Sequence, residues 1–282
     1  MSKLVPDQAD GLRRLLAHTP TRIVAVAGMG RGLGATTAAM NLGAALVQQG
    51  KEVLLLDEHG AAAESAAAVW ALEPPGTLAD VRCQRLGCGD AAARASCGVS
   101  VLPAAPASQP PGADLRRLWQ GDVILIDAAF DSDGQLSGLA QTADELVLVL
   151  QPHAASITAT YSGIKRLHYA HALKQLRFLV NGVADPGAAQ QIMTNLVQTG
   201  SRYLAVSLQP AGWVRADPHL RDARRLSRTV VEAFPASPAA VDFRRIAADM
   251  GQWPWRPAGE NLALSPAPPV RKAQGANTTA AH

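Results

Sequence analysis

The residues best suited to chemistry form a glycine-rich stretch near the start of the chain. It reads Gly28-Met29-Gly30-Arg31-Gly32-Leu33-Gly34-Ala35-Thr36-Thr37 and lies between an apolar run and a helix-forming run. In such a loop the backbone N–H groups turn inward, and the helix N-terminus that follows favours negative charge. The stretch therefore predicts a phosphate-binding loop. A plain glycine-rich turn is the alternative, and the threonine pair that follows makes it less favoured.

Carboxylates end two apolar runs that follow the loop. Asp57 ends the run over 52–57 and Glu58 follows it directly, and Asp127 ends the run over 122–127. An apolar strand that ends in aspartate is common in α/β proteins, but Asp127 gains weight because it follows the glycine loop in the right order. We expect Asp127 to hold a magnesium-bound water and Thr36 to belong to the same metal site.

The elements that must position these residues are predicted from the apolar runs, which are continuous rather than alternating. Continuous runs indicate strands buried on both faces, hence a parallel sheet covered by helices. The expected fold is one doubly wound α/β domain. Strands are expected at 22–27, 52–57, 99–102, 122–127, 145–151, 176–181 and 203–208; helices are expected at 35–49, 112–119, 156–173, 188–199, 218–227 and 238–250.

Composition fits this organisation. The chain has 282 residues, 48% of them apolar, which suits one large domain over 21–252. A short helical unit at 1–20 precedes it, and a tail at 253–282, rich in Pro and Ala, is expected to be disordered. The net charge of +3 is too small to indicate a nucleic-acid partner. The three cysteines form neither a disulfide frame nor a zinc pattern, and no signal peptide or membrane span is visible, so a cytoplasmic protein is expected.

The glycine loop resembles the deviant Walker A loop of the MinD/ParA family of P-loop ATPases, Gly-Lys-Gly-Gly-x-Gly-Lys-Thr-Thr. Laid on 29–37, the sequence keeps Gly32, Gly34, Thr36 and Thr37. The resemblance implies a MinD-like fold that binds ATP or ADP with Mg²⁺. It also implies the nucleotide-binding positions, which are Gly30, Arg31, Gly32, Leu33, Gly34, Ala35, Thr36, Thr37 and, at the adenine, Asn181.

The same loop differs from the family at the two lysine positions that contact the phosphates. Ala35 takes the place of the lysine that reaches the β- and γ-phosphates, and Gly30 that of the lysine that crosses to the partner's ATP in a dimer. A charge-assisted bond to phosphate contributes about 1.5–3 kcal/mol, so its loss predicts roughly tenfold to hundredfold weaker binding. The loss in hydrolysis rate is expected to be larger, on the order of a thousandfold or more.

The end of the second strand departs as well. Relatives carry Asp-x-Asp-x-Gly, whereas this chain has Asp57-Glu58-His59-Gly60, so His59 replaces the aspartate that positions the attacking water. The expected catalytic residues are Asp57, Glu58 and Asp127. Two interpretations stay open: an ATPase that has lost its activity, or an active one in which Arg31 and Glu58 substitute. Asn181 precedes Gly182 and fits a turn equally well.

Other segments resemble the FlhG/FleN branch of the family. Residues 7–15 are similar to its activator helix, Asp-Gln-Ala-x-x-Leu-Arg, which stimulates the GTPase FlhF. Residues 151–167 and 230–247 are also similar, and Ser156 is expected to cap the helix that follows it. The resemblance implies a regulator of flagellar number or placement that contacts an FlhF-like GTPase through Asp7, Gln8, Ala9, Leu12 and Arg13.

Further partners follow from the resemblance. They are flagellar switch or transcription regulators, a second copy in an ATP-linked homodimer, and a transient contact with the inner membrane or cell pole. The last helix could serve that contact, but we favour core packing for its apolar residues Val241, Phe243, Ile246 and Met250. Alternatives to a flagellar role are partition, or assembly of an exopolysaccharide synthase.

Overall fold

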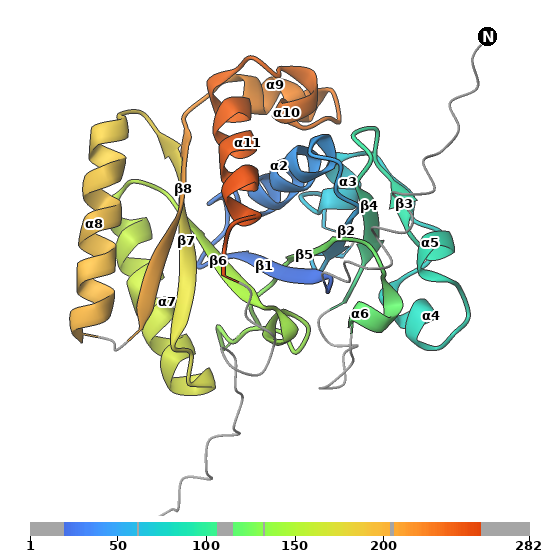
Figure 1. The fold of residues 1–282 in the computed structure, drawn as a ribbon, viewed down its shortest axis with the longest axis horizontal. Helices are drawn as coiled ribbons and strands as arrows, with labels where there is room; N and C mark the ends of the chain where they lie inside the picture. Colours follow the sequence, from blue (N-terminus) through green and yellow to red (C-terminus); the bar gives the residue numbers. More distant parts are fainter. Residues whose placement is uncertain (1–19, 61, 106–114, 132, 204–205, 255–282) are drawn as a thin grey trace, which may run out of the picture.

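The computed structural model describes residues 20–60, 62–105, 115–131, 133–203 and 206–254, without the side chains of residues 201 and 203. The predicted helix within 1–20 and the tail beyond residue 254 lie outside the described residues. Figure 1 shows a central sheet with helices on both sides. No helix in the described ranges is both long and apolar enough to span a membrane.

The sheet has eight strands in the order β3-β4-β2-β5-β1-β6-β7-β8. All neighbouring strands are parallel except β3 and β4, which confirms the predicted mostly parallel, doubly wound α/β fold. The strands are β1 (Arg22–Gly28), β2 (Val53–Asp57), β3 (Ala93–Arg94), β4 (Ser100–Pro103), β5 (Val123–Asp127), β6 (Glu145–Leu150), β7 (Gln175–Val183) and β8 (Ser207–Arg215).

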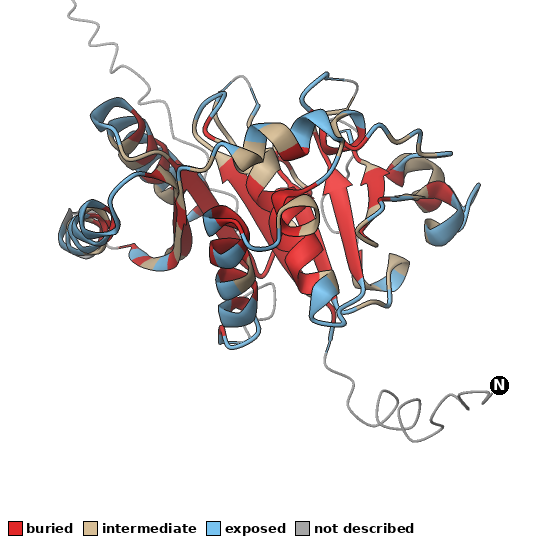
Figure 2. Cartoon of the chain, turned by 90° about the horizontal axis from the view of Figure 1, so that it is seen from above, coloured by how far each residue is buried: buried red, intermediate tan, exposed pale blue. Residues whose placement is uncertain are grey.

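Helices cover both faces of this sheet, and each face has its own apolar core. One core lies under α7, α8, α4 and α6, and the other under α2, α3, α9, α10 and α11; Figure 2 shows the buried strands between them. The helices are α2 (Ala35–Gln48), α3 (Ala66–Val69), α4 (Leu78–Arg82), α5 (Cys88–Ala91), α6 (Leu115–Leu118), η2 (Ala140–Thr142), α7 (Ala154–His171), α8 (Pro186–Tyr203), α9 (His219–Arg225), α10 (Val230–Ala233) and α11 (Pro238–Met250).

The largest error of the sequence prediction concerns the last strand. It was expected at 203–208, but β8 covers Ser207–Arg215 while α8 continues to Tyr203. β8 is the final strand of the sheet order and its burial is interrupted. An edge strand tolerates Pro210 and Gly212, which hide it from a search for continuous apolar runs.

Two local predictions about helices have different outcomes. Ser156 does not cap α7, because His153 Nδ1 accepts the Ser156 N–H at 3.1 Å while Ser156 Oγ accepts the Gln151 N–H at 2.9 Å. The serine braces the turn from β6 into α7 instead. In α11, Phe243, Ile246 and Met250 are buried in the core beside α2 and β8, which confirms the core-packing interpretation for these three. It is wrong for Val241, which faces away from the core and is 44% exposed.

Candidate functional site

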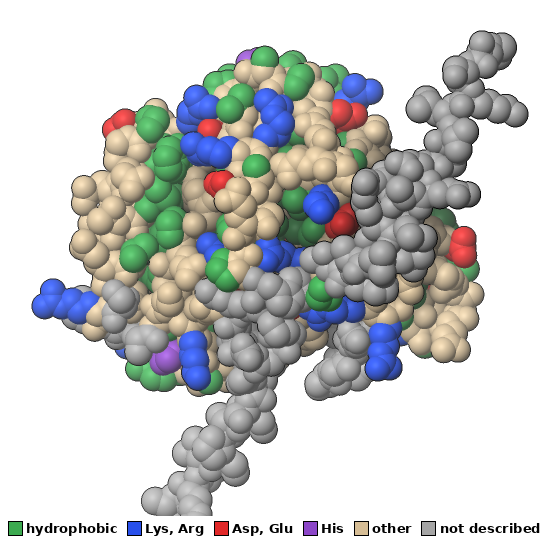
Figure 3. Space-filling view, in the orientation of Figure 1, with side chains coloured by type: hydrophobic (Ala, Val, Ile, Leu, Met, Phe, Trp, Pro, Cys, Tyr) green, Lys and Arg blue, Asp and Glu red, His purple; other side chains and the backbone are tan. Residues whose placement is uncertain are grey.

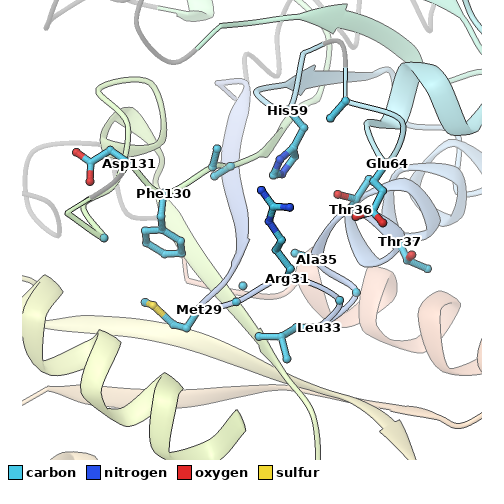
Figure 4. Close-up of a pocket in the computed structure, with 18 of the residues that line it drawn as sticks. Met29, Arg31, Leu33, Ala35, Thr36, Thr37, His59, Glu64, Phe130 and Asp131 are labelled. Carbon is cyan, nitrogen blue, oxygen red and sulfur yellow. The ribbon is translucent and has the colours of Figure 1, made fainter. Parts of the chain in front are cut away.

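The glycine loop, residues 28–37, forms the floor of a cavity of about 810 Å³ at the carboxyl edge of the sheet. The loop joins β1 to α2, and the segments after β2 and β5 complete the walls, as Figure 4 shows. The residues outside the loop that line the cavity are His59, Ala62, Ala63, Glu64, Ala128, Ala129, Phe130, Asp131, Gly134, Arg166 and Arg224. The structure thus brings the predicted loop residues together around one cavity.

The backbone of the loop is built for an anion. Gly32 and Gly34 have positive φ angles of 74° and 91°, which L side chains rarely adopt. Gly34 precedes α2 without providing a side-chain cap, and the first turn of α2 carries no acidic residue. Because the first N–H groups of a helix have no partner within it, an anion in the cavity can accept them.

Asn181, the predicted adenine contact, supports this loop from behind. Its Nδ2 donates to the Leu33 carbonyl at 2.9 Å, and a Cβ on Gly34 would lie 2.3 Å from that nitrogen. Asn181 does not line the cavity. Contact between Asn181 and adenine therefore stays a prediction, whereas its hydrogen bond ties the end of β7 to the loop.

We expect Gly34→Ala to cost about 1–2 kcal/mol of folding free energy, because alanine is strained at positive φ and its methyl group meets Asn181. Nucleotide affinity should fall with it, since the loop must shift. Urea denaturation of Gly34→Ala and of Gly34→Ala/Asn181→Ala separates backbone strain from the steric clash. Adding Asn181→Ala should recover only the stability that is lost to the clash. Gly50→Ala is the matched control, since it also has positive φ but nothing within 4 Å.

Asp57 is fully buried and its carboxylate organises the chain after β2. Oδ1 accepts the His59 N–H at 3.0 Å and Oδ2 accepts the Ala67 N–H at 3.1 Å. Burial raises the pKa of Asp57, and the nearby charge of Asp127 acts in the same direction. Asp57 does not line the cavity, so a catalytic role for it stays a prediction.

Glu58 ties β2 to the segment after β5. Its Oε1 accepts the Ser137 hydroxyl at 2.6 Å and its Oε2 accepts the Ala129 N–H at 3.0 Å. Burial raises the pKa of Glu58 to about 7, against the lowering effect of these two bonds. Glu58 does not line the cavity either. That Glu58 takes over the role of the missing aspartate stays a prediction. To do so, its carboxylate would have to release Ser137 and Ala129.

Asp127 and His59 face each other at the end of β5. The Asp127 carboxylate is fully buried and accepts no hydrogen bond from the described residues, and its Oδ1 lies 3.5 Å from His59 Nε2. Asp127 raises the pKa of His59, as a nearby carboxylate does for an imidazole.

A magnesium ion fits this arrangement. Asp127 itself does not line the cavity, whereas Thr36 and His59, its ion-pair partner among the described residues, do. A buried carboxylate that accepts no hydrogen bond from the described residues can take a further cation or a bound water as a partner. Within the described ranges no group of three or more His, Cys, Asp or Glu side chains could hold a metal. Phosphate oxygens and waters would therefore supply most of the ligands, as Mg²⁺ prefers.

Several residues that line the cavity, Phe130, Arg166 and Arg224 among them, were not identified from sequence as site residues, whereas Arg31 was. Arg31 extends across the cavity toward His59, while Met29 and Phe130 lie on the other side, as Figure 4 shows. Met29 packs on α7, where a Cβ at Gly163 would meet its sulfur, so this side chain anchors the loop. Arg166 and Arg224 come from helices far along the chain, and their local sequence does not mark them as residues of this cavity.

The chain is similar in sequence to two known proteins. No family model matches the chain. It is 31% identical to the antiactivator FleN of Pseudomonas aeruginosa over 255 residues, 86% of this chain and 91% of that protein. It is 26% identical to an uncharacterised ATP-binding protein of Methanocaldococcus jannaschii over 246 residues, 80% of this chain and 86% of that protein.

Solved structures agree on the fold. MinD of Aquifex aeolicus superposes with a TM-score of 0.64 at 18% identity, covering 84% of this chain and 100% of that one. MinD of Pyrococcus horikoshii, complexed with Mg-ADP, has a TM-score of 0.62 at 23% identity, covering 82% and 96%. At such identities the likeness shows a common fold.

Proposed function

Because this chain belongs to the FleN (FlhG) family of MinD-like P-loop ATPases, we propose that it is a regulator of flagellar number or placement, with little or no ATP hydrolysis. We propose that it holds ATP or ADP with Mg²⁺ in the cavity over the glycine loop. It would act in the cytoplasm, in transient contact with the inner membrane or the cell pole.

The observation that carries the nucleotide site is an anion-binding backbone next to a buried, unsatisfied carboxylate. The glycines at positive φ and the uncapped start of α2 support phosphate binding. Thr36 and Asp127 are the residues that would hold the magnesium ion and its waters. Bound, Mg²⁺ would neutralise phosphate charge.

Weak hydrolysis is supported by the residues that stand at the family's catalytic positions and by the contacts of the nearby carboxylates. Ala35 and Gly30 carry no charge toward the cavity, and His59 occupies the position of the water-orienting carboxylate. The carboxylates of Asp57 and Glu58 accept hydrogen bonds from other parts of the chain. The two lysine positions of the loop therefore supply no positive charge to stabilise a transition state.

The proposed partner is an FlhF-like GTPase, contacted through the unit at 1–20. Its residues Asp7, Gln8, Ala9, Leu12 and Arg13 lie outside the described residues. A glutamine on a short amphipathic helix can enter a GTPase site and orient a water. Flagellar switch or transcription regulators and a second copy of the chain, linked by ATP, are further proposed partners.

The test is GTP hydrolysis by an FlhF-type GTPase with the full chain added. We expect stimulation by the unchanged chain and loss of most of it with Gln8→Ala. Gln120→Ala, which changes an exposed glutamine in the core domain, should stimulate like the unchanged chain. Equal stimulation by both variants, or none by the unchanged chain, would contradict the proposed partner.

The position of Arg31 favours a second candidate function, an active ATPase with substituted residues. Its guanidinium extends into the cavity toward His59, where it could replace a lysine. The two candidates differ in a measurable property: only an active ATPase has ATP turnover that depends on Thr36 and Asp127.

A further inference from the structure

Positive charge reaches the cavity from three separate parts of the fold. The basic side chains that line it, apart from His59, are all arginines: Arg31 from the loop, Arg166 from α7 and Arg224 from α9. Figure 3 shows basic side chains gathered over the region of α9 to α11. The positions where the family carries lysines thus lack charge, while Arg31 of the same loop and two helices outside it provide charge.

Arg166 is held at the cavity wall by the turn after β5. A Cβ at Gly134 would lie 3.1 Å from its Cζ and Nη2, so the guanidinium rests directly on that glycine. Gly134 has a positive φ of 71°, and Asp131 Oδ1 braces the turn by accepting the N–H groups of Asp133 at 2.9 Å and Gln135 at 2.8 Å. The guanidinium of Arg166 thus packs against a turn that is itself held by hydrogen bonds.

Arg224 has no carboxylate partner among the described residues, as is also true of Arg221, whereas two other arginines nearby are paired. Arg225 pairs with Asp222 at 3.3 Å and Arg228 with Glu232 at 3.6 Å. In the part of the chain that the structure describes, neither Arg166 nor Arg224 lies within ion-pair distance of a carboxylate. Two unpaired guanidinium groups at one cavity favour a polyanionic ligand.

We propose that Arg166 and Arg224, together with Arg31, bind the phosphate chain of a nucleoside di- or triphosphate in place of the missing loop lysines. This inference rests on the proposed nucleotide site. A guanidinium is always charged, and its planar fork matches phosphate oxygens in a bidentate way. The long side chains bring the charge from α7 and α9 across the cavity, while the loop contributes its backbone N–H groups.

The test is calorimetry of the full chain with ADP and with ATP in the presence of MgCl₂. We expect Arg166→Gln and Arg224→Gln each to weaken binding of at least one of them by about tenfold. Lys165→Gln and Arg225→Gln are matched controls, since they remove neighbouring charges that do not line the cavity. They should change affinity by less than about twofold, allowing for their long-range charge.

Adenosine separates phosphate contacts from all others, because it carries no phosphate. If the chain binds adenosine measurably, its affinity should be the same in all four variants. Nucleotide affinities of Arg166→Gln and Arg224→Gln at the control level, with clear binding by the unchanged chain, would overturn this inference and leave the nucleotide site intact. No binding of ADP or ATP by the unchanged chain at millimolar concentration would overturn both.

Discussion

Ala35→Lys is expected to raise the affinity of the chain for ATP by about tenfold to hundredfold, the range of a charge-assisted hydrogen bond to phosphate. Ala35 is the first residue of α2 and lines the cavity, so a lysine there extends toward the bound phosphates. The same lysine should lower stability without nucleotide by about 0.3–1 kcal/mol, because a cation at a helix N-terminus opposes the helix dipole.

Calorimetry with ATP and thermal unfolding with and without nucleotide measure both effects. Ala35→Gln is the matched control, since its side chain is long and uncharged and should raise affinity little. ATP turnover should rise with Ala35→Lys only if Asp127 and its surroundings support catalysis. Equal affinity of Ala35→Lys and Ala35→Gln would show that the loop does not bring this position to the phosphates.

Glu58→Gln is expected to remove a pH dependence of stability on the order of 3 kcal/mol, at about 1.36 kcal/mol per pKa unit. The pKa of Glu58 is raised from 4.5 to about 7 in the folded chain. Between those values the folded state holds a proton that the unfolded state releases, so stability falls as pH rises from about 4.5 to 7. The penalty is complete above pH 7 and absent below pH 4.5.

Urea denaturation at pH 5 and pH 8 checks this prediction. The unchanged chain should lose more stability than Glu58→Gln over that interval, and the difference isolates Glu58 because His59 and Asp57 titrate in both. Glutamine can keep both contacts, with its carbonyl accepting the Ala129 N–H and its amide donating to Ser137. Glu73→Gln, at an exposed position, is the control. Parallel pH curves for all three chains would contradict a raised pKa at Glu58.

The parts that sequence alone predicted are those with a local cause. β1, β2, β5 and β6 are continuous apolar runs because both faces of a central parallel strand are buried, and the structure confirms them within about a residue at each end. The short helices α3, α4, α5 and α10 were not predicted, since four or five residues are too few to show a period. β8 was misplaced because an edge strand need not be continuously apolar.

Within the site, the same distinction applies. By itself the sequence determined the loop, because glycines spaced between a strand and a helix specify an anion-binding backbone through local conformation. Only the tertiary structure decided that Asp57 holds the Ala67 N–H while its neighbour Glu58 holds Ala129 and Ser137. Likewise, only the fold brought Arg166 and Arg224 to the loop, since their contacts depend on how helices pack and leave no trace in nearby residues.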